Sequence, residues 1–161
     1  RFLRDRFGVR GFADSVERIV SATQETAYDT VIFLGHNGPI GLGDRPEDIC
    51  GKDWQPLGGD FGDPDFADAI AQARELGKEI PLVTFGHMHH RLRHTKTQLR
   101  TDVIQDRYGT VYLNAASVPR IMKYQGEVIR NFSLVTLHQG KVLDTELVWV
   151  GETFQAVTIC A

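Results

Sequence analysis

Three of the six histidines in this 161-residue chain are placed where they could bind metal ions. His36 comes just after the apolar segment 30–34, and His87 and His89 come just after the apolar segment 80–85. A glycine separates each segment from its first histidine, which permits a tight turn and a close backbone approach. Neutral imidazole binds Zn, Fe, Mn and Ni ions. The three histidines therefore predict a site that holds one metal ion or is shared between two.

The elements before these histidines determine whether the rings can meet. Both apolar segments are short and rich in β-branched and aromatic residues, which predicts strands buried on both faces. The ends of parallel strands face a common crevice, where α/β proteins bind ligands. His87 and His89 are two residues apart, so an extended backbone places both rings on one side. We therefore expect His36, His87 and His89 to converge.

Two helices are expected between and before these strands. Apolar residues recur at steps of three and four over residues 12–27, with Asp14 as a possible N-cap and Glu17 three residues later. Asp63 followed by proline predicts the start of a second helix, which Gly77 would end.

A long loop and a succession of strands complete the pattern. Residues 35–63 hold eight of the 16 glycines, and a loop of this length is expected to be functional. Beyond residue 98 we expect a strand at 99–104, another at 110–113, and a hairpin of 132–137 with 142–150. This order predicts an α/β fold with an antiparallel portion.

The composition excludes some classes of partner. With 18 basic and 21 acidic residues the net charge is −3, which gives no reason to expect binding to nucleic acid or to an anionic membrane. No apolar run approaches the roughly 18 residues of a membrane helix. Cys50 and Cys160 do not form a disulfide framework, so a reducing compartment is expected, cytoplasmic or, in a plant, the plastid stroma.

Several segments together resemble the C-terminal half of a calcineurin-like metallophosphoesterase. The later motifs of that family are Gly-His and Gly-His-x-His, which resemble residues 35–36 and 86–89 here. Residues 111–117 partly match the Asn-Pro-Gly-Ser-like turn of the family, and the hairpin at 132–150 is similar to its last one. Residues 46–54 resemble a branch from cyanobacteria and plant plastids.

The resemblance implies a fold and an activity. The fold would be α/β, a two-sheet sandwich flanked by helices, with the whole chain as part of one domain. The activity would be hydrolysis of a phosphate mono- or diester by a metal-bridging hydroxide, acting on a phosphorylated small molecule or a phosphoprotein. Of two divalent ions (Mn, Fe or Zn), His36 and His87 would bind one and His89 the other. Asn37 and Arg91 are candidates for contacting the substrate.

The earlier motifs of the family, which supply the remaining ligands and the general acid, do not occur in their usual form. The chain contains no Asp-x-His and no Asn-His. Residues 59–63 have the spelling Gly-Asp-x-x-Asp but follow the first Gly-His, so we interpret Asp63 as a helix cap instead. The chain starts at Arg1 without a methionine, and we expect the catalytic residues upstream of it.

The absence of the earlier motifs limits what this segment is expected to do by itself, and two other functions are considered. Alone, the segment is expected to bind at most one metal ion, weakly, and to be inactive. A non-catalytic interaction scaffold built on the same fold is the main alternative. A barrel hydrolase using His-x-His is disfavoured, because such barrels need about 200 residues or more.

Overall fold

The computed structural model describes residues 2–159. The helices in this part of the chain are α1 (Phe2–Phe7), α2 (Phe12–Glu25) and α3 (Pro64–Glu75). The strands are β1 (Thr30–Leu34), β2 (Glu79–Phe85), β3 (Val103–Gln105), β4 (Val111–Asn114), β5 (Ile121–Tyr124), β6 (Glu127–His138) and β7 (Lys141–Val150).

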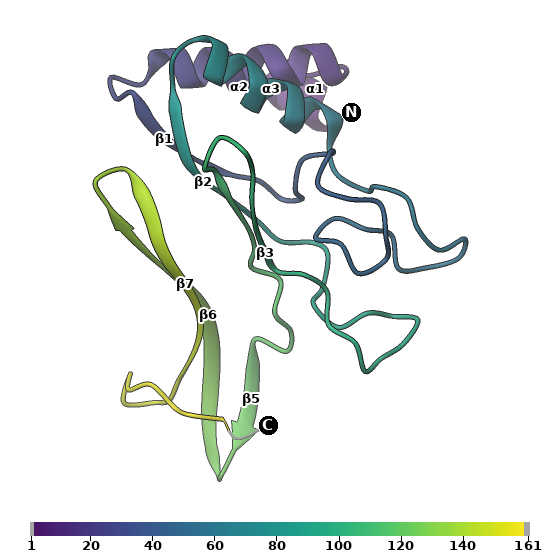
Figure 1. Cartoon of the computed structure of the whole chain (residues 1–161), viewed down its shortest axis with the longest axis vertical. Coiled ribbons are helices and arrows are strands. Elements are labelled where there is room, and N and C mark those ends of the chain that lie inside the picture. Colours follow the sequence, from purple (N-terminus) through teal and green to yellow (C-terminus); the bar gives the residue numbers. More distant parts are fainter. Residues whose placement is uncertain (1, 160–161) are drawn as a thin grey trace.

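The first sheet has the strand order β1-β2-β4-β3. β1, β2 and β4 run parallel, and β3 pairs antiparallel with β4. Helices α2 and α3 lie side by side next to this sheet (Figure 1). Their apolar residues, among them Phe66 and Ile70, pack with Phe33, Val83 and Phe85 of the strands. This core fixes the ends of β1 and β2, where the histidines follow.

The second sheet is antiparallel, with the order β5-β6-β7. Val135 of β6 and Val142 of β7 pack against Leu82, Val111 and Leu113 of the first sheet. The β6–β7 hairpin is the long ribbon that extends beyond the first sheet in Figure 1. The expected α/β fold with two sheets is therefore confirmed. None of the helices in residues 2–159 is long and apolar enough to cross a membrane.

The expected first helix is confirmed as α2, but its predicted N-cap is wrong. Gly11 occupies the N-cap position and makes no side-chain cap hydrogen bond. Asp14 lies inside the first turn, and its Oδ2 accepts a hydrogen bond from the backbone N–H of Arg10, 2.8 Å away. The carboxylate thus satisfies a donor just before the helix rather than one inside it.

The prediction that the strand at residues 30–34 is buried on both faces is wrong. Of β1, only Phe33 is buried, while Ile32 is 51% and Leu34 83% exposed. β1 is the edge strand of its sheet in the described part of the chain, and its outward residues have no cover there. A short apolar run alone does not distinguish an edge strand from a central one.

The region after residue 90 also differs from expectation. The strand predicted at 99–104 is confined to β3, and only an isolated bridge joins Arg91 to Leu99. Arg100 explains this difference. Its side chain is buried and donates hydrogen bonds to carbonyls of a distant loop, so the segment lacks the alternating pattern of a strand. The predicted hairpin is confirmed as β6 and β7, but β5 was not foreseen.

Candidate functional site

The ends of β1 and β2 bring His36 and His87 together. The two strands pair in parallel, with Leu34 opposite Thr84. Beyond them, the Gly86 N–H donates to the His36 carbonyl at 3.1 Å. The imidazole centroids of His36 and His87 lie 4.9 Å apart with the ring planes at 61°. Both side chains are exposed, so the pair is open to a ligand from solvent.

The two glycines that precede these histidines have different roles. A Cβ on Gly35 would lie 2.6 Å from the Asn37 carbonyl oxygen and 2.7 Å from a ring carbon of Phe66. A Cβ on Gly86 would meet only the His36 carbonyl oxygen, at 3.8 Å. The expected close approach therefore holds for Gly35 alone. At the second turn the unusual backbone belongs to His87 itself, whose φ is 66°, a conformation uncommon outside glycine.

His89 is exposed, and among residues 2–159 no ring contact joins it to His36 or His87. Its carbonyl oxygen accepts a hydrogen bond from Arg100 Nε at 3.2 Å. Within residues 2–159, no group of three or more His, Cys, Asp or Glu side chains lies close enough to hold a metal ion. The structure thus brings together two of the three predicted ligands.

Asn114 supports the turn that carries His87. It is fully buried at the end of β4, and its Nδ2 donates to the Met88 carbonyl at 2.6 Å. Its Oδ1 accepts from the Ala116 N–H at 3.1 Å. The Asn114 carbonyl also lies 2.8 Å from Nε2 of His90. The sequence indicated Asn114 only as part of a partial turn motif, although an asparagine ending a buried strand is itself a signal of such a role.

Asn37 joins the turn after β1 to the long loop. Its side chain is buried, and Nδ2 donates to the Phe61 carbonyl at 2.7 Å and to Asp63 Oδ1 at 3.3 Å. Its Oδ1 is buried without a hydrogen-bond partner among the described residues. Arg91, the other substrate candidate, is exposed. A contact of either residue with substrate stays a prediction.

The two acidic residues of the Gly-Asp-x-x-Asp spelling have structural partners. The Asp60 carboxylate accepts from the Gly41 N–H at 2.6 Å and from the Gly62 N–H at 2.8 Å. Asp63 is the N-cap residue of α3, as predicted, but its carboxylate makes no cap hydrogen bond and accepts from Asn37 instead. Asp60 and Asp63 therefore order the long loop.

A buried arginine ties this loop to the second histidine turn. Arg100 Nη1 donates to the carbonyls of Asp48 and Gly51, at 2.9 and 2.5 Å. Its Nη2 lies 3.3 Å from Asp53 Oδ2 in an ion pair that is almost fully buried. Burial lowers the pKa of Arg100, and the Asp53 carboxylate opposes that shift. Sequence reasoning missed this residue, because nothing in its local pattern distinguishes it from a surface arginine.

Two aromatic rings, Phe61 and Trp54, form a cluster beside the histidine pair. Phe61 lies nearly parallel to His87, with an interplanar angle of 10° and centroids 6.4 Å apart. Trp54 meets Phe61 edge to face, with centroids 4.7 Å apart. The Arg93 guanidinium carbon lies 5.5 Å from the centre of the Trp54 ring. The long loop thus places apolar ring surface next to the candidate metal ligands.

Cys50 is buried in the same loop. Burial raises the pKa of its thiol to about 12, so the thiolate that binds metals is scarce at neutral pH. It is a free cysteine. Cys160 lies outside the described residues.

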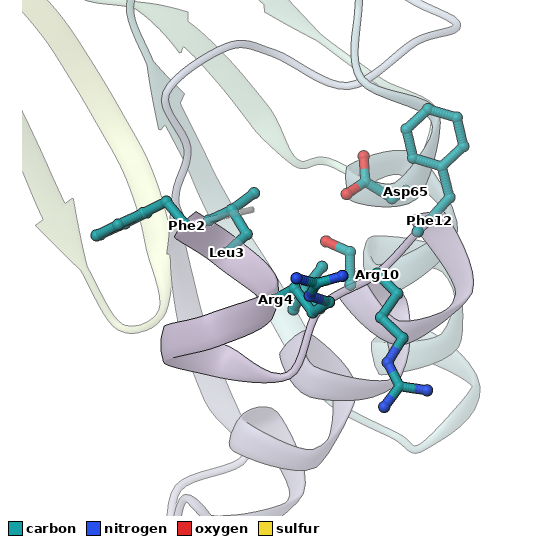
Figure 2. A pocket seen from close by; sticks show the side chains of 9 residues that line it. Phe2, Leu3, Arg4, Arg10, Phe12 and Asp65 are labelled. Carbon is teal, nitrogen blue, oxygen red and sulfur yellow. The ribbon is translucent and has the colours of Figure 1, made fainter.

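A separate hollow of about 830 Å³ lies between α1 and the starts of α2 and α3. Figure 2 shows Phe2 and Leu3 of α1 on one side, and Phe12 and Asp65 on the other. None of the predicted site residues lines it, so it does not belong to the histidine site.

Comparison of the chain with protein families, with curated proteins and with solved structures finds no match. The resemblance to metallophosphoesterases therefore stays a prediction that depends on the motifs themselves.

Proposed function

We propose that this chain provides the histidine ligands of a metal-dependent phosphoesterase, which hydrolyses a phosphate mono- or diester. In this proposal His36 and His87 bind one divalent ion, and His89 binds a second. Such ions, when bound, activate a water molecule and stabilise the charge on the phosphoryl oxygens.

The distance between His36 and His87 is the observation that supports the proposal most. With Zn–N bonds of about 2.0–2.1 Å, two imidazoles that bind one ion at angles of about 90–110° have centroids roughly 4.5–5.2 Å apart. The 4.9 Å between the two rings falls inside this range. The donors also fit chemically, since imidazole is a preferred ligand of Zn, Mn and Fe.

The number and charge of the ligands determine what this chain can do alone. Three neutral imidazoles bring no negative charge to offset two divalent ions, and the nearby carboxylates of Asp60 and Asp63 are held by other partners. A complete two-metal site would therefore need carboxylate ligands and a general acid in addition to these histidines. We expect the isolated chain to bind at most one ion, weakly, and to lack turnover.

Residues around the histidines hold their backbone in place. Asn114 fixes the carbonyl of Met88, between the two ligands of the second turn. Arg100 fixes the carbonyl of His89 and binds the long loop. Both side chains act on the backbone, so their contribution is to keep the rings oriented before a metal ion arrives.

Turnover by the natural full-length protein tests the proposal. His87→Ala and His89→Ala should each lower the hydrolysis rate of a generic aryl phosphate at least about 100-fold, on the scale of losing a metal. His138→Ala, which changes an exposed histidine at the hairpin end of β6, is the matched control and should keep the wild-type rate. Wild-type rates in the first two variants, or no turnover in the full-length protein, would favour the interaction scaffold.

A further inference from the structure

We infer that the cluster of Trp54 and Phe61 makes this site selective for phosphate esters whose organic group is a flat aromatic ring. The inference rests on the proposed function, because it places the phosphate at the metal ion of His36 and His87. It adds the class of substrate, which the histidines alone do not indicate.

Phe61 lies beside His87, and part of its ring is exposed to solvent. Its ring lies nearly parallel to the His87 ring at 6.4 Å between centroids, and 43% of the residue is exposed. In an aryl phosphate, a single oxygen joins the ring to phosphorus, so ring and phosphate are close neighbours. A phosphate held beside His87 would therefore bring its aromatic group next to the exposed surface of Phe61.

The rings of Phe61 and Trp54 are nearly perpendicular to each other. The two rings meet at 82° with centroids 4.7 Å apart, so together they form a right-angled corner. A flat ring stacked on one member of the corner presents its edge to the other, and both contacts are favourable geometries for aromatic pairs. A saturated ring has no π face, so it would make neither of these aromatic contacts.

The backbone of the loop keeps this corner in place. The Phe61 carbonyl accepts from Nδ2 of the buried Asn37, and the Phe61 N–H donates to the Cys50 carbonyl at 3.0 Å. The position of Phe61 is thus tied to the turn that carries His36. Phe61 is 43% exposed beside the histidines, so part of its ring is accessible to a ligand there.

The charges around the corner suit an anionic ester. The exposed Arg93 lies over the face of Trp54, and its cation attracts a phosphate dianion. Two carboxylates of the same loop have partners of their own. Asp53 forms an ion pair with Arg100 and accepts from the Arg93 N–H, and Asp60 accepts from two backbone N–H groups.

Phenyl phosphate and cyclohexyl phosphate form a matched pair of probes, since they differ only in whether the six-carbon ring is flat and aromatic. Binding to the 161-residue chain with Zn²⁺ is measured by the fluorescence of Trp54, with Trp149→Phe removing the second tryptophan. We expect phenyl phosphate to bind at least about fivefold more tightly, the lower end of what one aromatic stacking contact contributes.

Variants at Phe61 test whether the corner causes this preference. Phe61→Leu keeps an apolar side chain but should abolish the preference, Phe61→Tyr should keep it, and Phe154→Leu, which changes a 90% exposed phenylalanine elsewhere, should leave it unchanged. Equal binding of the two esters, no binding of either, or a preference that persists in Phe61→Leu would overturn the inference. Zn²⁺ affinity is measured separately in the same variants. Metal binding that depends on His36 and His87 without ring preference would overturn this inference and leave the proposed function standing.

Discussion

The imidazoles of His36 and His87 lie 4.9 Å apart, although a long loop, helix α3 and strand β2 separate the two residues along the chain. Parallel pairing of β1 with β2 produces this contact, because it aligns Leu34 with Thr84 and so brings the two following turns to the same edge of the sheet. The relationship is a property of the fold rather than of local sequence.

The glycine before each histidine offers a first test. Gly35→Ala should destabilise the chain by about 1–3 kcal/mol, because the new methyl group overlaps Phe66 and the Asn37 carbonyl. Gly86→Ala should change stability by less than about 1 kcal/mol, because the space around it is open. Urea unfolding of the two variants checks this difference. Equal losses at both positions would contradict the packing described here.

Asn114 offers a second test, of the turn that carries His87. Asn114→Ala leaves the Met88 carbonyl and the Ala116 N–H without their partner, and each unsatisfied buried group costs about 1–3 kcal/mol. We expect a corresponding loss in the free energy of unfolding and shifted NMR signals of the His87 ring. Unchanged His87 signals in a folded variant would show that Asn114 does not orient this turn.

Arg100 and Asp53 form the third test. Arg100→Met leaves the buried Asp53 carboxylate without its partner. It should lower the free energy of unfolding by about 3–5 kcal/mol, the usual effect of breaking a buried ion pair. Arg100→Lys should recover little, because a lysine cannot provide the fork of donors that reaches both loop carbonyls. Arg91→Met, at an exposed position, is the control and should be near neutral. Thermal or urea unfolding measures all three variants, and a mild effect in Arg100→Met would contradict the burial of this pair.

Sequence patterns correctly predicted the elements whose formation depends on residues close together in the sequence. Apolar periodicity located α2, and the Asp63–Pro64 pair located the start of α3. These patterns gave wrong or missing predictions where contacts between residues far apart in the sequence determine the structure. Nothing local showed that Leu34 lies on an edge strand, or that Arg100 turns inward to a loop some fifty residues earlier in the chain. In the site, the pairing of His36 with His87 was predicted, because it follows from two neighbouring parallel strands. The ring cluster of Trp54 and Phe61 was not predicted, because it depends on the path of a long loop.

Cys50 gives a fourth prediction, on pH. Because burial raises the pKa of its thiol to about 12, the residue stays protonated from neutral pH up to well above pH 9. In a Cys160→Ser background, native Cys50 should react with a thiol reagent at pH 8 far more slowly than after unfolding in urea. Fast reaction of the native chain would show that the long loop opens, and would return Cys50 to consideration as a metal ligand.

Zn²⁺ titration of the 161-residue chain, in competition with a chromophoric chelator, tests the shared metal site most directly. We predict at most one ion per chain, with affinity lowered at least about tenfold in both His36→Ala and His87→Ala and unchanged in His138→Ala. Two tightly held ions per chain, or an affinity that neither His36→Ala nor His87→Ala changes, would contradict the account.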